Sequence, residues 1–322
     1  MAKNVVISTL GYANPRLPFG MDKWDFDAQT EWMLAFLRQK LEAVLPDRPD
    51  LIVFPECANR FAQCKDETRE EYHARQAAYY RYAGDRFVRW LSKVAEENQT
   101  NIAYSAVRCL PGTDKRRNST IFLNRSGKAA GIYDKNHLVL EEYTVGGMEY
   151  GRTADLIQLD IGKVASVICF DLNFDDLMYA YKPQKPDLIV FCSAYHGGLR
   201  QAQWAYTCRS YMVSAVLGQP SRILDPFGRV MATSTNYRDH ATAAVNLDYV
   251  LCHLDYNTLK LQALKRKYGP GVEISDPGFV GSVMITSRLE AVSAEEMAAE
   301  FEIEKLDDYF ARVNRHRDEH LL

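Results

Sequence analysis

Three apolar segments of this chain each lead to a titratable side chain at their C-terminal end. Residues 50–54 lead to Glu56, residues 129–133 to Lys135 and residues 163–168 to Cys169. A free thiol, with a pKa of about 8.5, needs a base or a cation to become a good nucleophile at neutral pH. A glutamate can accept its proton, and an ammonium can stabilise the oxyanion that forms when a thiolate attacks a carbonyl. Together the three side chains supply acyl-transfer chemistry without histidine.

A structural interpretation of Cys169 stands beside the chemical one. Unpaired cysteines are among the most buried residues of proteins, so Cys169 by itself is better explained as a small core side chain. The end of a core strand, however, holds a side chain rigidly at the edge of a sheet, where crevices form. Since three separate strands end in this way, we favour a catalytic role for Cys169 over a purely structural one.

The elements that position these side chains alternate between helical and extended patterns. Asp27 is the expected N-cap of a first helix that runs to Pro46, and helical spacing from Glu67 to Glu97 predicts one long helix. Strands and hairpins are expected at 5–9, 50–56, 101–107, 119–133, 155–168, 186–194, 213–217, 221–233 and 242–247, with helices at 175–181, 201–212 and 258–267. This order predicts a layered α/β fold.

Three motifs resemble those of the nitrilase superfamily of carbon-nitrogen hydrolases. They are Leu51-Ile52-Val53-Phe54-Pro55-Glu56, Tyr133-Asp134-Lys135-Asn136-His137-Leu138 and Val167-Ile168-Cys169-Phe170-Asp171-Leu172-Asn173-Phe174. Their order, and separations of 79 and 34 residues between the key side chains, are similar to those of the family. The likeness covers roughly Asn4 to Asp248.

The resemblance implies a four-layer αββα sandwich that commonly pairs into dimers, and it requires no cofactor and no metal. We expect residues 1–285 to form the carbon-nitrogen hydrolase domain and residues 286–322 a C-terminal helical extension. The extension either covers a neighbouring subunit or is a solvated terminal helix.

The resemblance also assigns roles in the site. Glu56 is the expected general base, Lys135 the oxyanion stabiliser and Cys169 the nucleophile that forms a thioester. The backbone N–H of Phe170 is the second expected oxyanion donor. Many members carry a second glutamate shortly after the lysine; Glu142 is the better positional match and Glu141 the alternative.

The chain departs from the family pattern four residues after the cysteine. Members often carry arginine there, and some use it to hold the carboxylate of a carbamoyl amino acid, whereas this chain has Asn173. A neutral amide supplies no charged clamp, so another residue must hold any substrate carboxylate. Asn173, Tyr195 and His196 are the expected lining of the substrate pocket, although His196 equally well orders the adjoining glycine loop.

The sequence is compatible with more than one substrate and more than one class of protein. The substrate is expected to be a small amide or an N-carbamoyl compound, with a small nitrile as the alternative. A cysteine protease would pair Cys192 with His196, or Cys169 with His137. A non-catalytic binding subunit of the same fold would be expected to lack one of the three key residues, and all three are present.

Composition limits the class of protein. The chain has 322 residues and a net charge of −3, and its acidic and basic residues are interleaved. It therefore shows no basic segment of the kind that indicates nucleic-acid binding. No segment approaches the length of about 18 apolar residues needed to cross a membrane. Seven cysteines without C-x-x-C spacing argue against a disulfide framework and a zinc ribbon. We expect a cytoplasmic protein that acts on a small molecule, does not bind membranes, and forms a homodimer or higher homo-oligomer.

Overall fold

A computed structural model describes residues 3–321 of the chain, which divide into two compact units. Val6–Ala243 forms the larger unit, and the residues from Ala244 onward, together with those before Val6, form the smaller one. This division falls earlier in the sequence than the boundary expected after residue 285. The reason is that β13 (Tyr249–His253) pairs along its length with β15 (Ser282–Ser287), so the residues around 250 fold with the C-terminal segment.

Two six-stranded mixed sheets build the layers of the larger unit. The first has the order β12 (His240–Asn246), β1 (Asn4–Leu10), β2 (Leu51–Val53), β3 (Asn101–Cys109), β4 (Arg116–Leu123) and β5 (Ala129–Asp134). The second has the order β11 (Val230–Thr233), β10 (Arg222–Leu224), β9 (Tyr211–Val216), β8 (Leu188–Ser193), β7 (Gly162–Ile168) and β6 (Ile157–Leu159). The sheets face each other through contacts of β4 with β7 and of β2 with β9.

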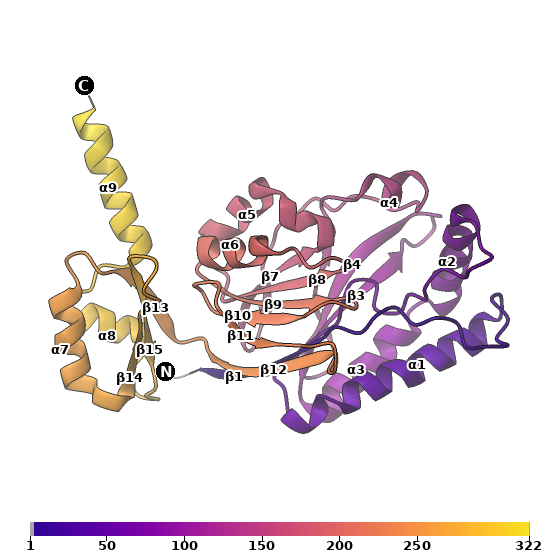
Figure 1. Cartoon of the computed structure of the whole chain (residues 1–322), viewed down its shortest axis with the longest axis horizontal. Helices are drawn as coiled ribbons and strands as arrows, with labels where there is room; N and C mark the ends of the chain where they lie inside the picture. Colours follow the sequence, from indigo (N-terminus) through magenta and orange to yellow (C-terminus); the bar gives the residue numbers. More distant parts are fainter. Residues whose placement is uncertain (1–2, 322) are drawn as a thin grey trace. The chain divides into compact units, whose positions relative to one another are not determined.

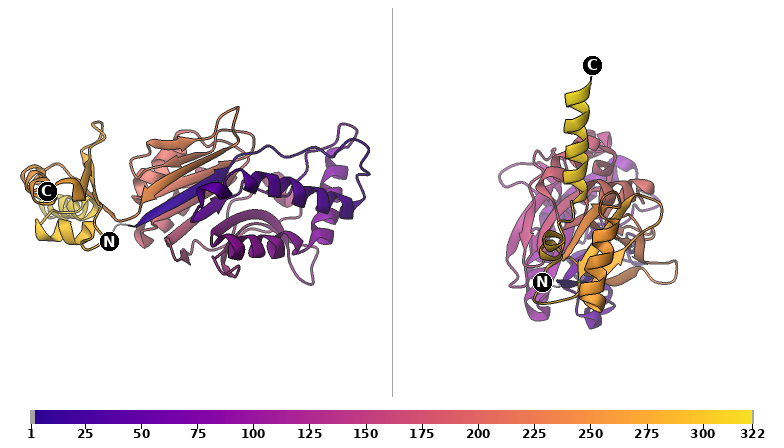
Figure 2. Two further views of the ribbon diagram at one scale, coloured as in Figure 1. Left: turned by 90° about the horizontal axis from the view of Figure 1, so that it is seen from below. Right: turned by 90° about the vertical axis from the view of Figure 1, so that its left-hand side faces the viewer.

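Helices cover the outer face of each sheet (Figures 1 and 2). On the first sheet lie α1 (Phe26–Glu42), α2 (Arg69–Ala83) and α3 (Arg86–Asn98), and on the second lie α5 (Asp175–Tyr181) and α6 (Leu199–Cys208). Between two such layers a strand is buried on both sides, which is why every residue of β8 is buried. The expected αββα sandwich is therefore confirmed.

Two helix boundaries differ from the sequence prediction for local reasons. The long helix expected from Glu67 to Glu97 is two helices, because Gly84 ends α2 with a φ of +53°, a conformation that favours glycine. Helix α1 begins at Phe26 and is capped by Asp25 rather than Asp27, since the Asp25 side chain accepts a hydrogen bond from the Ala28 N–H at 3.0 Å.

The smaller unit has an antiparallel sheet of its own. Its strand order is β13, β15, β14 (Val272–Ser275), and its helices are α7 (Thr258–Tyr268), α8 (Ala294–Glu300) and α9 (Leu306–His320). Apolar side chains from β13, β15, α7 and α8, such as Cys252, Ile285, Leu264 and Met297, form a separate core. Only helices are predicted here from the sequence, although Gly269-Pro270-Gly271 and Asp276-Pro277-Gly278 bracket β14 with turn signals.

Candidate active site

The structure brings Glu56, Lys135 and Cys169 together at the carboxyl ends of three strands. Glu56 follows β2, Lys135 follows β5, and Cys169 follows β7. Lys135 Nζ lies 3.0 Å from Glu56 Oε1, and both side chains are almost fully buried. Cys169 is also buried and lies close enough to both groups for their charges to act on its thiol.

A second carboxylate contacts the lysine from a short helix that the sequence analysis did not predict. Glu142 lies on α4 (Leu140–Thr144), and its Oε2 is 2.7 Å from Lys135 Nζ and 2.8 Å from the Val139 backbone N. Glu141, the alternative, instead pairs with Arg69 and His73. Of the two neighbouring glutamates, Glu142 is therefore the one that contacts the lysine.

Asn118 joins the two carboxylates and was missed from the sequence. Its buried amide nitrogen donates to Glu56 Oε1 at 2.7 Å and to Glu142 Oε1 at 3.0 Å. The predicted hairpin could have identified Asn118, because continuing the pairing of its two strands one residue past Ser119 places Asn118 opposite Lys135. The Lys135 N–H indeed donates to the Asn118 carbonyl at 2.9 Å.

Cys169 occupies a sharp turn between β7 and the 3-10 helix η2 (Cys169–Asn173). Its φ of +49° is rare for a residue with a side chain and persists only where the surroundings impose it. The buried carboxylate of Asp171 fixes this turn by accepting hydrogen bonds from the Tyr133 hydroxyl at 2.7 Å, the His137 N–H at 2.7 Å and the Ile168 N–H at 3.2 Å. The N–H groups at the start of such a helix, including that of Phe170, have no acceptor within it.

Burial and neighbouring charge set the protonation states. Burial and the Glu56 carboxylate together raise the pKa of Cys169 to about 12. Burial would also raise the pKa of Glu56, but Lys135 and Arg60 outweigh it and lower that pKa. Burial opposes the charge of Lys135, but Glu56 and Glu142 raise its pKa well above the ordinary value. At neutral pH the site therefore holds a thiol, a carboxylate and an ammonium.

The three residues expected in the substrate pocket have different surroundings. Burial, followed by the charge of Cys169, raises the pKa of Tyr195 to about 12, and the Asn173 side chain acts on the same hydroxyl. Asn173 Nδ2 donates to the carbonyl of Phe170, the residue after the cysteine, at 3.1 Å. His196 accepts a hydrogen bond from the Gly198 N–H at 3.1 Å through Nδ1, the contact expected of a residue that orders the glycine loop.

The cysteine–histidine pairings have no support in the geometry. Within residues 3–321, neither Cys169 nor Cys192 has a hydrogen bond to a histidine. The His137 ring stacks on the Phe174 ring with a distance of 3.8 Å between the ring centroids. The His137 Nδ1 lies 3.1 Å from Asp171 Oδ1. Cys192 is fully buried within β8.

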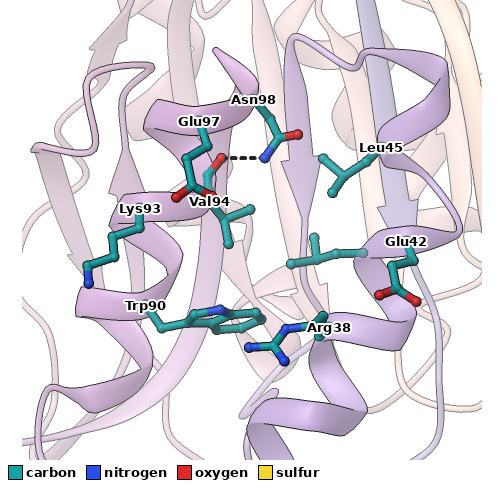
Figure 3. Close-up of a pocket in the computed structure, with 9 residues that line it drawn as sticks. Arg38, Glu42, Leu45, Trp90, Lys93, Val94, Glu97 and Asn98 are labelled. Atoms are coloured by element: carbon teal, nitrogen blue, oxygen red, sulfur yellow. Dashed lines mark hydrogen bonds between the residues drawn. The ribbon is translucent and has the colours of Figure 1, made fainter.

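A pocket on the outer helical layer lacks this chemistry. It lies between α1 and α3 and is lined by side chains such as Arg38, Trp90 and Lys93, with no cysteine, serine or histidine among its lining residues (Figure 3). Among residues 3–321, no three His, Cys, Asp or Glu side chains form a group that could hold a metal ion. In the same part of the chain, every helix is too short or too polar to span a bilayer.

Comparison with known proteins places this site in a family. The model of the carbon-nitrogen hydrolase family matches residues 13–251, which include Glu56, Asn118, Lys135, Glu142 and Cys169. The chain belongs to the carbon-nitrogen hydrolase family. The resemblance to the nitrilase superfamily is thereby confirmed.

Two relatives share a modest part of the sequence. The chain is 26% identical over 168 residues to a deaminated glutathione amidase of Escherichia coli O157:H7, covering 45% of this chain and 62% of that protein. It is 22% identical over 219 residues to the omega-amidase NIT3 of Saccharomyces cerevisiae, covering 60% of this chain and 74% of that protein. The chain thus matches less than two thirds of the length of the first of these relatives.

Solved structures agree on the carbon-nitrogen hydrolase fold. Nit3 of Saccharomyces cerevisiae, a member of branch 10 of the nitrilase superfamily, superposes with a TM-score of 0.58 at 18% identity, covering 76% of this chain and 90% of that one. The NitFhit protein of C. elegans superposes with a TM-score of 0.63 at 14% identity, and the match covers 94% of this chain and 98% of that one. An amidase mutant from Nesterenkonia sp. AN1, with acrylamide added to its active-site cysteine, superposes with a TM-score of 0.62 at 13% identity. This match covers 82% of this chain and 99% of that one.

Proposed function

We propose that this protein hydrolyses the carbon–nitrogen bond of a small amide or N-carbamoyl compound through a thioester on Cys169. The observation that carries the proposal is the buried Lys135 ammonium, held by Glu56 at 3.0 Å and Glu142 at 2.7 Å beside a thiol. This arrangement supplies a base, a nucleophile and an oxyanion donor in one water-poor site.

The first half of the reaction forms the thioester. Glu56 accepts the thiol proton as Cys169 Sγ attacks the carbonyl carbon, because a thiol whose pKa is about 12 is not ionised at neutral pH without a base. The Lys135 ammonium and the Phe170 N–H stabilise the negative oxygen of the tetrahedral intermediate. Glu56 then passes its proton to the nitrogen, the carbon–nitrogen bond breaks, and ammonia or an amine leaves.

The second half of the reaction releases the acid. Glu56 takes a proton from a water molecule as that water attacks the thioester carbonyl, and the same two donors stabilise the second oxyanion. The carbon–sulfur bond then breaks, and the proton held by Glu56 returns to the Cys169 sulfur. Asn118 contributes by fixing Glu56 and Glu142 relative to each other.

The test combines detection of ammonia with intact-protein mass spectrometry. Wild type, Cys169→Ala and Cys192→Ala are mixed with small amides, N-carbamoyl amino acids and nitriles. We expect wild type and Cys192→Ala to release ammonia and to carry an acyl adduct on Cys169, and we expect Cys169→Ala to do neither. Equal release by Cys169→Ala would refute the assignment of the nucleophile, and no release from any substrate would refute the hydrolase.

A further inference from the structure

One oxygen of the Glu56 carboxylate is bonded by two donors. Oε1 accepts a hydrogen bond from Asn118 Nδ2 at 2.7 Å and lies 3.0 Å from Lys135 Nζ. All three side chains are buried, so bulk water does not replace either donor. A carboxylate oxygen has about two positions that accept a hydrogen bond, and both positions of Oε1 are thus occupied. A proton adds to Oε2 without displacing Asn118 or Lys135.

The same amide also donates to the second carboxylate of the site. The other hydrogen of Asn118 Nδ2 is directed to Glu142 Oε1 at 3.0 Å, and Glu142 Oε2 lies 2.7 Å from Lys135 Nζ. Two carboxylates therefore share one buried ammonium, an arrangement in which the second negative charge is unfavourable. Each N–H of Asn118 stabilises the ionised form of one carboxylate, because a hydrogen bond to the charged form favours that form.

The backbone of Asn118 is held on both sides. Asn118 pairs with Val107 in β3, and its carbonyl accepts the Lys135 N–H at 2.9 Å. The orientation of its amide is also determined, since the reverse orientation would place Oδ1 against two carboxylate oxygens. Asn118 consequently fixes the rotation of the Glu56 carboxylate, so that Oε1 and not Oε2 faces the amide.

Three further groups act on the charge of Glu56. Lys135 follows β5, Arg60 lies in the loop after Glu56, and Cys169 follows β7. Burial raises the Glu56 pKa, and Lys135 and Arg60 lower it. These groups all remain when Asn118 is replaced by an apolar residue of similar size. The loss of its N–H groups should therefore raise the Glu56 pKa.

We propose that Asn118 is a positioning residue that, together with Lys135, occupies Glu56 Oε1 and thereby directs the thiol proton of Cys169 to Glu56 Oε2. The S–H bond breaks as its proton bonds to Oε2, and its electron pair forms the carbon–sulfur bond with the substrate carbonyl. The proton on Oε2 is then given to the leaving nitrogen. This route rests on the proposed function, whereas the effect of Asn118 on Glu56 can be measured without turnover.

The kinetic test replaces Asn118 by leucine, which has a similar size but no donor. With the small amide that wild type hydrolyses fastest, we expect Asn118→Leu to lower kcat about 100-fold. KM should stay within about 3-fold, because both N–H groups of Asn118 already bind carboxylates. The acid limb of kcat/KM should move up by about 1 pH unit, since Glu56 then gains its proton at higher pH. An unchanged acid limb would overturn the proposal.

Asn118→Asp has the size of the wild-type side chain and supplies a second variant if the leucine variant does not fold. It adds a third carboxylate around one ammonium, so the acid limb should move up further than in Asn118→Leu. A limb at the wild-type pH would refute the role of Asn118. A purely structural role would lower the amount of folded enzyme and leave the limb where it is.

Asn101→Leu is the matched control. Asn101 is buried in the same sheet, and its Nδ2 also donates to a carboxylate, Asp160 Oδ1, at 2.8 Å. It pairs with Leu51 at the start of β2, whereas Glu56 follows the end of that strand. We expect kcat to stay within about 3-fold and the acid limb within about 0.3 pH units of wild type. Changes as large as those of Asn118→Leu would contradict a specific contact with Glu56.

The proton route itself is tested by geometry. The thiol and the accepting oxygen must come within hydrogen-bond reach for the proton to transfer. In a crystal structure of the wild-type protein, Cys169 Sγ should therefore lie nearer to Glu56 Oε2 than to Oε1. The reverse order would overturn the assignment of the proton to Oε2.

A titration without turnover separates this proposal from the proposed function. Glutamates labelled with carbon-13 in the side-chain carboxyl group are followed by NMR in Cys169→Ala and in Cys169→Ala/Asn118→Leu, and Glu56→Gln identifies the Glu56 signal. We expect the Glu56 pKa to lie about 1 pH unit higher in the double variant. Equal values would refute the role of Asn118, whereas a raised pKa in a protein that hydrolyses none of the amides would refute only the hydrolase.

Discussion

Lys135 lies closer to Glu142 than to the proposed base, with Nζ 2.7 Å from Glu142 Oε2 and 3.0 Å from Glu56 Oε1. A buried ammonium needs a carboxylate partner, and here the nearer one is supplied by Glu142. Glu56 is consequently free to accept a proton without leaving Lys135 unpaired. Glu142 therefore has a positioning role, namely to hold the Lys135 ammonium in place, and this role can be tested.

Glu142→Gln is expected to lower kcat by about 100-fold with a smaller change in KM, because Lys135 loses a charged contact that orients it toward the oxyanion. Steady-state kinetics on an amide substrate measures both constants. Glu141→Gln is the matched control, since Glu141 pairs with Arg69 and His73 instead, and it should retain kcat within about 3-fold. Equal losses in the two variants would contradict the role of Glu142.

The alkylation of Cys169 by iodoacetamide should accelerate with pH. With a thiol pKa of about 12, the thiolate fraction grows about tenfold for each pH unit between pH 7 and pH 10. Peptide mapping by mass spectrometry at several pH values gives the rate at this residue. A rate that levels off between about pH 9 and pH 10 would instead indicate a thiol close to its ordinary pKa of about 8.5.

The acid limb of kcat/KM should lie at unusually low pH. Glu56 must be ionised to act as a base, and its lowered pKa keeps it ionised until the pH falls below the ordinary value of 4.5. Activity is then lost as the pH drops through the Glu56 pKa. A pH–rate profile for protein that remains folded tests this, and a midpoint well above 4.5 would contradict the expected direction of the shift.

Gly151→Ala should displace the end of β5 and with it Lys135. The Gly151 N–H donates to the Lys135 carbonyl at 2.7 Å, and a Cβ at this position would overlap the Asp134 carbonyl and lie 3.0 Å from the Lys135 oxygen. We expect a cost of about 1–3 kcal/mol in unfolding free energy and about a 100-fold loss of kcat. Chemical denaturation and kinetics measure the two effects.

Gly84→Ala is the control for that substitution. Gly84 has a φ of +53°, but a Cβ there meets nothing within 4 Å. Because its ψ of −124° lies outside the left-handed helical region, the variant should lose about 1–3 kcal/mol of stability through backbone strain while kcat stays within about 3-fold. A loss of kcat similar to that of Gly151→Ala would show that instability, rather than displacement of Lys135, explains both.

Tyr133→Phe should destabilise the cysteine turn. The Tyr133 hydroxyl donates to the buried Asp171 carboxylate at 2.7 Å, and loss of a hydrogen bond to a charged group costs about 1.5–3 kcal/mol. Thermal denaturation should show a lower midpoint. Tyr143→Phe, at an exposed tyrosine, should leave the midpoint within about 1 °C, and equal shifts in the two variants would argue against the Asp171 contact.

Much of the layered fold could be predicted because its strands are short apolar segments ended by turn residues. The strand that leads to Cys169 and the hairpin around residues 124–128 lie where their patterns indicate. The sheet of the smaller unit escaped prediction, since β14 and β13 are short and only partly buried. The pairing of β13 with β15, such as that of Cys252 with Val283, joins residues distant in the sequence, which local patterns do not report.

The amino-acid sequence by itself determined the chemical types of the site and their order, because glutamate, lysine and cysteine each stand at the end of an apolar strand. Only the tertiary structure decided how they are coupled. It placed Glu142 rather than Glu141 on Lys135, and it bridged the Glu56 and Glu142 carboxylates with Asn118. These relationships depend on distances between separate strands and loops, and such distances exist only once the sheets have packed.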